Sequence, residues 1–564
     1  MSSPHAAAAP LGHAPGPEER APRSAPVLAT RSGLRVALAL ARAEGWLLAR
    51  SILVAGGLLV AALVAWSFLT RSEPLWWKAA WQIGYAQMIL SAAALVAAHL
   101  AAGRAARNNV EDLYDSFPVT ASTRTAGHLL SVLGALPASV VLVAAASALT
   151  EWRGAFGHPD PAVLAGGVLL VTAGAMIGVA VGRRFPHPFV GVLAALAWAA
   201  PFSQSNRFNG AVTWLFPWAI SQQLANFPHP VPGYPPGAAH AVELAGIAAL
   251  AAVVALAWQA RAVIARAALI AVGAAAVAVI GIAGAVQLQP ISTPNLNRLV
   301  AQAATPTNFQ TCTTANGVRY CLYGDFAPLR SSLEGPVNAI LSYVPVRPDQ
   351  ALSVEQATGL FLPDTTLTHG HPAAKVDTWT KELASAPAKH PSRSAIFVGV
   401  GSWPARNAAG ARTARLQLAL AAADWAVGLP PSAGNLDTAT PCVPFNQARE
   451  PIAIWMTLEA THTKVKGIQD LGGGPGYLAA PGPQITGAGY LLAQAMTRLP
   501  ASKVTEVLGR NWTAWTNAHA TDAQLAAALG IPLPAEPTLN PTPGPGMRVS
   551  PPLPGTPAPQ VCTP

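Results

Sequence analysis

The stretch from Asn108 to Thr125, NNVEDLYDSFPVTASTRT, combines apolar and acidic side chains in a regular pattern between two long apolar runs. Its apolar positions recur at i, i+3, i+4 and i+7, which is one stripe of a helix: Val110, Leu113, Tyr114 and Phe117. Its acidic positions take the opposite face: Glu111, Asp112 and Asp115. Asn109 stands where an N-cap would stand, and Pro118 ends the pattern. We therefore predict a short amphipathic helix over residues 109–117.

No catalytic constellation stands out in the sequence. The chain has no H-E-x-x-H, no G-x-S-x-G and no cysteine pair with zinc-finger spacing. His369 and His371 in THGHP are metal-ligand types, but a His-x-His in a Gly/Pro loop is more often exposed to solvent. A G-x-x-x-x-G-K-[ST] loop is also absent, so the chain lacks the usual cradle for nucleotide phosphates. We expect no catalytic residue, no metal and no cofactor in this chain.

The four cysteines all lie in the last part of the chain: Cys312, Cys321, Cys442 and Cys562. In TCTTANGVRYCLY, Asn316-Gly317 favours a two-residue type I′ hairpin turn. That turn places Cys312 opposite Cys321 at a non-hydrogen-bonded site, where Cα atoms lie about 4.5 Å apart and a disulfide can form. We predict the pair Cys312–Cys321. The pair Cys442–Cys562 then follows by elimination.

The composition is that of a membrane protein. The 564 residues are 52% hydrophobic and only 11% charged, against about 25% charged in soluble domains. Seven segments approach the twenty or so apolar residues that cross a bilayer: roughly Ser51–Leu69, Ala79–Ala102, Ala126–Leu149, Ala162–Gly182, Pro188–Phe202, Ala239–Trp258 and Ala267–Leu288. The fifth is short. His99, His128 and Glu243 lie within these spans near their ends, where snorkelling explains them as well as function does.

Arginine placement predicts the orientation. With the N-terminus inside, the inner segments hold thirteen arginines, and the outer loops hold only Arg71, Lys78, Arg153 and Arg207. An odd number of spans then places residues from about 290 onward outside, where disulfides form. The segment 31–50 is basic and amphipathic, so we expect it to lie in the inner interface, or else to extend the first span. The basic residues form no aromatic-interleaved patch, so nucleic acid is not an expected partner.

The predicted fold is an α-helical polytopic membrane domain of about seven spans followed by an α+β extracytoplasmic domain. The boundaries are a disordered tail at 1–30, an interfacial helix at 31–50, a transmembrane domain at 51–288, an extracytoplasmic domain at 289–531 and a Pro-rich tail at 532–564. In the extracytoplasmic domain we predict a strand at SAIFVGV and helices at Ala408–Val427, Glu450–Thr461 and Gly487–Leu499, with Thr521 capping a further helix. Binding, gating or assembly is its expected role.

The order of these elements resembles the permease subunits of ATP-binding-cassette exporters of the type-2 export class. The order is an interfacial helix, two spans, an amphipathic loop helix and further spans, with the aromatic segment RFNGAVTWLFPWAISQQL after the fifth. The loop EDLYDSFPVTASTRTAGHLL is especially similar to that of actinobacterial members. The resemblance covers about residues 31–258. It implies a location in the cell membrane, a separate cytoplasmic ATPase that binds the ATP, and a homodimer or a heterodimer with another permease.

The resemblance also implies that helix 109–117 is a coupling helix that docks on the ATPase. Leu113, Tyr114 and Phe117 would form its buried anchor. Its acidic residues Glu111, Asp112 and Asp115 would meet basic residues of the partner. Pro118 would make the exit rigid, and Arg124 belongs to the Arg-Thr pair of the motif. The alternative is a helix resting on lipid headgroups, although acidic residues are poorly suited to an anionic leaflet.

Two other classes of function stay open. The first is a membrane-anchored extracytoplasmic enzyme, which would need a catalytic constellation that the sequence does not display. The second is a regulatory or assembly protein that has a permease-like membrane part and does not transport. A neighbouring gene encoding an ATPase would favour the exporter over both.

Overall fold

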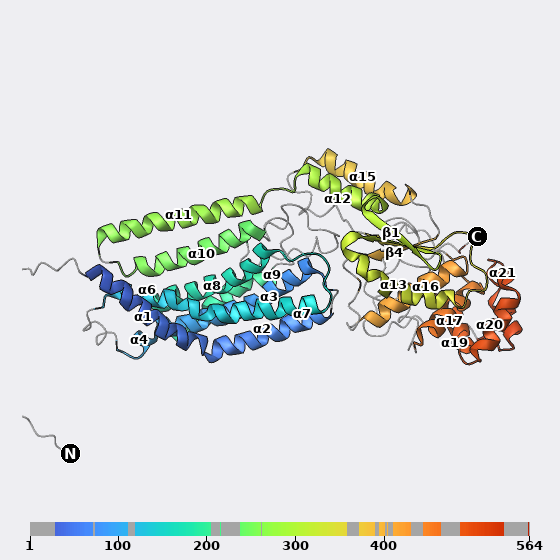
Figure 1. The fold of residues 1–564 in the computed structure, drawn as a ribbon, viewed down its shortest axis with the longest axis horizontal. Coiled ribbons are helices and arrows are strands. Elements are labelled where there is room, and N and C mark those ends of the chain that lie inside the picture. The colour runs from blue at the N-terminus through green and yellow to red at the C-terminus, as the bar shows by residue number, and fades with distance from the viewer. Residues whose placement is uncertain are drawn as a thin grey trace, which may run out of the picture.

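The computed structural model describes residues 29–71, 74–110, 119–204, 237–260, 262–357, 371–389, 394–400, 410–429, 444–463 and 485–534, with Leu215, Trp403 and Cys562 as single positions. Figure 1 shows long helices running side by side as a bundle. Helix α1 (Ala29–Ala49) lies at one end of the bundle, and a C-terminal domain that begins at Thr293 lies at the other end. We call these the α1 end and the domain end.

Six helices of the bundle are long and apolar enough to cross a membrane. They are α2 (Ile52–Arg71), α3 (Trp76–Ala102), α6 (Ala121–Ser131) continued through the 3-10 turn Val132–Ala135 into α7 (Leu136–Trp152), α8 (Pro161–Arg184), α10 (Gly237–Ala257) and α11 (Val263–Gln287). The chain is therefore a multi-pass membrane protein by the length and composition of these helices.

The fifth of the seven predicted spans differs from the prediction, because its helix is too short to count as a membrane span. It forms α9 (Pro188–Gln204), a helix of 17 residues, which is shorter than the twenty or so needed to cross the hydrocarbon core squarely. The aromatic segment that follows it lies outside the described residues, except for Leu215. The other six predicted spans match observed helices to within a few residues.

Glycines of α8 bring this helix into backbone contact with α3. Gly174, Gly178 and Gly182 recur every fourth residue and face the backbone of α3. A Cβ atom built at Gly178 would overlap the carbonyl oxygen of Leu95, and one at Gly182 would lie 2.5 Å from the carbonyl oxygen of His99. Small residues at this spacing let membrane helices approach closely. The α3–α8 pair is therefore the closely packed centre of the bundle.

Polar side chains add to this centre. Gln87 of α3 and Ser139 of α7 bond to each other, since the Ser139 hydroxyl donates to Gln87 Oε1 at 2.9 Å and Gln87 Nε2 donates to the Ser139 carbonyl at 3.0 Å. Ser91 donates to the Leu170 carbonyl of α8 at 2.7 Å and accepts from Trp198 Nε1 of α9 at 3.0 Å. These bonds satisfy groups that would be costly to leave unpaired in an apolar surrounding.

The C-terminal domain contains a four-stranded mixed sheet in the order β1-β2-β3-β4. The strands are β1 (Gln310–Ala315), β2 (Val318–Tyr323), β3 (Ser353–Ala357) and β4 (Ala395–Gly399), and β1 is the antiparallel member. Figure 1 shows α12 (Thr293–Ala304) and α15 (Ala373–Lys389) together on one side of the sheet and α13 (Arg330–Leu341) and α16 (Ala411–Ala426) on the other. The predicted strand SAIFVGV is confirmed as β4.

The predicted hairpin and its disulfide are confirmed. Asn316 and Gly317 have φ values of 53° and 79°, as a type I′ turn requires. The register pairs Cys312 with Cys321, and their Cα atoms lie 4.1 Å apart in a disulfide. Cys562 is also disulfide-bonded and is buried in the domain core. Its predicted partner Cys442 lies outside the described residues, so that pairing stays a prediction.

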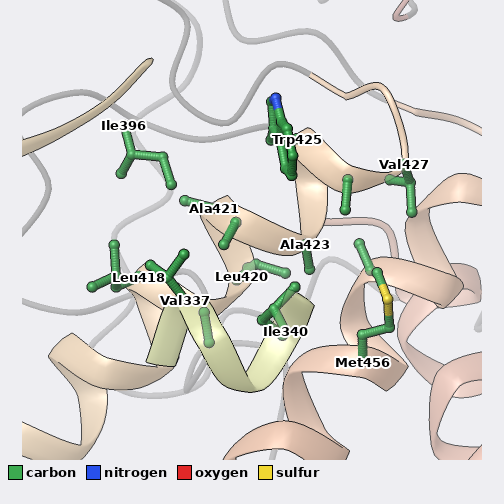
Figure 2. Close-up of a cluster of buried hydrophobic side chains, with 14 of the residues drawn as sticks. Val337, Ile340, Ile396, Leu418, Leu420, Ala421, Ala423, Trp425, Val427 and Met456 are labelled. Carbon is green, nitrogen blue, oxygen red and sulfur yellow. The ribbon is translucent and has the colours of Figure 1, made fainter. Parts of the chain in front are cut away.

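Helices build the rest of the domain core. They are α16, α17 (Arg449–Thr461), α19 (Gly487–Met496), α20 (Ala501–Arg510), α21 (Trp512–Trp515) and α22 (Asp522–Leu529). Figure 2 shows side chains of α13, α16 and α17 converging, among them Ile340, Leu420 and Met456. The predicted cap at Thr521 is confirmed as a capping box with Gln524. The helices predicted at Ala408–Val427, Glu450–Thr461 and Gly487–Leu499 correspond to α16, α17 and α19.

Two turns of the bundle join the core of this domain, and we call this contact the seam. Leu75 before α3 and Phe156 between α7 and α8 form a parallel β-bridge. Leu75 is 1% exposed and belongs to the domain's hydrophobic core. The ring of Phe156 stacks on Phe326 with centroids 5.9 Å apart. Trp76, the first residue of α3, is buried and donates from its Nε1 to Glu151 Oε1 at 3.0 Å.

Candidate functional site

The predicted coupling residues fall mainly outside the described part of the chain. This holds for Glu111, Asp112, Leu113, Tyr114, Asp115, Phe117 and Pro118, whereas Arg124 is described. The structure does describe the two elements between which residues 111–118 run. These are α4 (Arg104–Arg107) and α6, and both lie at the α1 end of the bundle.

The chain enters this segment through a helix-ending turn. Asn109 has a left-handed backbone with φ 53°. The amide of Asn109 donates to the Ala106 carbonyl at 3.2 Å, and the amide of Val110 donates to the Ala105 carbonyl at 3.1 Å. This pair of bonds is a Schellman motif that closes α4. The prediction of Asn109 as an N-cap is wrong, because an N-cap residue needs an extended backbone.

Arg107 fixes the entry to the loop between α8 and α9. Its Nη1 donates to the Pro186 carbonyl at 3.1 Å, and its Nη2 donates to the Leu100 carbonyl at 2.5 Å. Gly103 lies so close to α8 that an added Cβ would stand 3.2 Å from the Gly182 carbonyl oxygen. The chain therefore reaches residue 111 from a backbone position that α8 determines.

The residues that follow 111–118 are also held by hydrogen bonds, within α6 and between α6 and α8. Thr120 caps α6 by accepting from the Thr123 amide at 3.2 Å. The next polar contact is between α8 and α6, where Arg183 Nε donates to the Thr125 hydroxyl at 3.1 Å. Arg124 lies in the first turn of α6 and is half-buried. Both ends of residues 111–118 are thus anchored to α8.

Helix α1 packs closely against α6, the helix that follows residues 111–118. Built Cβ atoms at Gly127 and Gly134 would collide with Leu40 and with the Gly45 backbone, respectively. Glu44 of α1 pairs with Arg104 of α4 at 3.5 Å. The site is therefore a platform of α1, α4 and α6, and residues 111–118 connect α4 to α6 along the chain. The platform carries charged, hydroxyl and apolar side chains, and its described residues include no group of three His, Cys, Asp or Glu side chains that could hold a metal ion.

A second polar cluster lies at the domain end. Glu243 of α10 is 4% exposed. It accepts from Gln287 Nε2 of α11 at 2.6 Å and lies 3.5 Å from His240 Nδ1. Snorkelling toward the membrane surface does not explain Glu243, because its partners are inside the bundle. The i, i+3 spacing of His240 and Glu243 is a sequence pattern from which their contact could be predicted. The contact with Gln287 could not be predicted in this way, because Gln287 lies 44 residues from Glu243.

The remaining histidine candidates do not assemble a metal site among the described residues. His371 has its Nε2 at 2.8 Å from the Ile291 carbonyl and its ring edge-on to Trp379. It therefore helps to pack α15 near the end of α11. His369 lies outside the described residues. His99 is buried in α3 with Nε2 at 3.1 Å from the His187 carbonyl.

The C-terminal domain buries three carboxyl groups near one another. Glu450 accepts from the amide and the hydroxyl of Thr486, the N-cap of α19. The pKa of Glu450 is raised from 4.5 to about 8: burial is the main cause, the Thr486 hydrogen bonds act against it, and nearby Asp522 adds to it. Burial also raises the pKa of Asp522 to about 6 and that of Asp424 well above its ordinary value. Nothing in the sequence pattern marked this cluster, because its members lie on α16, α17 and α22.

These carboxyl groups predict how the stability of the domain depends on pH. Because the folded pKa of Glu450 is about 8 and its ordinary value is 4.5, the folded state binds more protons between these values. The free energy of unfolding therefore falls as pH rises from about 4.5 to 8. We expect the unfolding temperature to fall over this range in wild type and to fall less steeply in Glu450→Gln, measured by thermal unfolding of the detergent-purified chain.

Glu506→Gln is the matched control, since Glu506 is an exposed carboxylate of the same domain. It should keep the wild-type pH dependence. In Glu450→Gln the unfolding temperature should still fall somewhat with rising pH, because the pKa values of Asp424 and Asp522 are also raised. An identical slope in wild type and Glu450→Gln would show that Glu450 does not titrate in this range.

Comparison of the chain with family models, with curated proteins and with solved structures found no match. By its fold the chain is a multi-pass membrane protein with a helical bundle and a domain of helices and a mixed sheet. A disulfide joins two strands of that sheet.

Proposed function

We propose that this protein is the membrane-spanning subunit of an ATP-driven exporter, coupled to a separate cytoplasmic ATPase through residues 109–117. In this proposal the α1 end faces the cytoplasm and the C-terminal domain lies outside. The observation that carries it is the platform at the α1 end. An aromatic and acidic segment runs between α4 and α6; α4 is tied to the loop that follows α8, and α6 is tied to α8.

The packing of the bundle supports this proposal in physical terms. A coupling element must pass a displacement to the spans instead of absorbing it. Arg107 and Arg183 join the platform to the α8 region, and the glycines of α8 leave no space between α8 and α3. A push on residues 111–118 would therefore move α3 and α8 together, because closely packed helices shift as units.

The test is co-purification of the tagged full-length chain with cytoplasmic proteins of its source. Wild type should retain an ATPase that carries a nucleotide-binding motif, identified by mass spectrometry. The variant Tyr114→Ala/Asp115→Arg should lose most of it, because it removes an aromatic anchor and reverses a charge at the contact. We expect at least a tenfold loss, which corresponds to about 1.4 kcal/mol.

Val346→Ala/Asp349→Arg is a matched control. It shortens an apolar side chain and reverses an acidic charge at two exposed positions of the C-terminal domain, and it should retain the ATPase fully. If no ATPase accompanies the wild type, or if both variants retain it equally, residues 109–117 are not a coupling helix.

A further inference from the structure

Helix α1 presents an outward face that no other described element covers. Its inward face lies against the α6 region, where a Cβ at Gly45 would stand 3.3 Å from the Ser131 carbonyl oxygen. The opposite face exposes Arg35 and Arg42, and Arg50, which directly follows the helix, is exposed beside them; we count it with this outward face. Several large apolar side chains of α1 are also exposed, at 50–62%: Leu34, Leu38, Trp46 and Leu47.

The charge on this outward face has one sign. Glu44 is the single acidic residue of α1, and it turns inward to pair with Arg104. Arg50 lies over the ring of Trp46 at 4.0 Å from its centroid, so a cation and an interfacial aromatic residue form one unit. Such a face suits a surface that offers negative charge together with apolar material.

The position of α1 identifies that surface. Helix α1 ends at Ala49, and the apolar helix α2 begins at Ile52, only two residues later. Ile52 is 86% exposed, so α2 faces outward from its first residue. A helix joined this closely to an apolar span lies at the boundary of the bilayer, where Trp and Arg side chains reach the headgroups.

We propose that the outward face of α1 is a binding site for anionic phospholipid headgroups, with Arg35, Arg42 and Arg50 as the phosphate-binding residues. Arginine suits this role because its planar donors match phosphate oxygens. Leu34 and Leu38 enter the acyl boundary beside the headgroups. Anionic lipid binds more strongly than zwitterionic lipid at this site, because each arginine near the surface adds an electrostatic attraction.

Lipid at this site also steadies the platform described above. Helix α1 contacts α6 through glycines and contacts α4 through Glu44. Fixing α1 therefore restrains both ends of residues 111–118. This consequence rests on the proposed function, whereas the lipid site itself does not require an ATPase.

The experiment measures thermal unfolding of the full chain in nanodiscs at physiological salt. One set of discs contains only phosphatidylcholine, and the other contains about one third phosphatidylglycerol. Wild type should unfold several degrees higher in the anionic discs, because a ligand that binds the folded state raises its stability. Arg35→Gln/Arg42→Gln/Arg50→Gln should lose most of this gain. The corresponding triple lysine variant should keep more than half of it, because it keeps the charge.

The charge-matched control is Arg412→Gln/Arg498→Gln/Arg510→Gln, three exposed arginines of the C-terminal domain, which should keep the full gain. Direct retention of phosphatidylglycerol in detergent, counted per chain by mass spectrometry, should fall about tenfold in the α1 glutamine variant. Equal gains in wild type and that variant, or no gain in wild type, would overturn the proposal. Neither readout depends on an ATPase, so the coupling proposal and the lipid proposal fail separately.

Discussion

Replacing Gly178 by alanine should separate α8 from α3 and destabilise the whole bundle. The added Cβ would overlap the carbonyl oxygen of Leu95, which belongs to a helix backbone and cannot turn aside. Overpacking of this kind costs about 1–3 kcal/mol, and more where the neighbour is rigid. We expect a lower unfolding temperature and a smaller fraction of monodisperse protein by size-exclusion chromatography of the detergent-solubilised chain.

Gly281→Ala is the matched control because it makes the same change within α11, where a Cβ meets no atom within 4 Å. It should leave the unfolding temperature unchanged or raise it slightly, since alanine favours the helix. If the two variants behave alike, α3 and α8 do not pack as closely as the structure shows.

Replacing Phe326 by alanine should destabilise the C-terminal domain and weaken its hold on the bundle. Phe326 is fully buried in the domain core and stacks on Phe156 from the turn between α7 and α8. Removing a buried phenylalanine side chain costs about 3–5 kcal/mol. We expect the domain to unfold roughly 10 °C lower, and the turn at Phe156 to exchange its amide hydrogens faster in hydrogen–deuterium exchange.

Phe445→Ala tests whether the loss of any phenylalanine has this effect. Phe445 belongs to the same domain but is 54% exposed, so its removal should change the unfolding temperature by only a degree or two. Faster exchange at Phe156 should occur in Phe326→Ala alone. Unchanged exchange there would mean that the stacked rings do not hold the seam together.

Local patterns predicted the parts of the fold that neighbouring residues determine. Asn316-Gly317 fixed the hairpin register, and the register brought Cys312 to Cys321. Six long helices could be predicted from apolar runs, because a membrane span is an uninterrupted stretch of apolar residues in the sequence. The short α9 was also visible as a short run.

Contacts between distant residues were not predictable from such patterns. The four-residue spacing of Gly174, Gly178 and Gly182 is visible in the sequence, but nothing there names α3 as the facing helix. The seam joins Leu75, Phe156 and Phe326 across about 250 residues. Likewise, the carboxyl cluster of Glu450 depends on tertiary burial. For the coupling segment, the sequence predicted an N-cap at Asn109, whereas local hydrogen bonding there closes the preceding helix.

The seam also bears on the order in which the protein is made. Leu75 and Phe156 are synthesised long before Phe326, yet all three belong to one packed contact. The domain that contains Phe326 is made after these turns and therefore completes its core on turns that the membrane insertion machinery has already delivered. A chain whose early helices insert wrongly would leave apolar surface of this domain uncovered. Correct folding of the C-terminal domain thus reports on correct insertion of the helices that precede it.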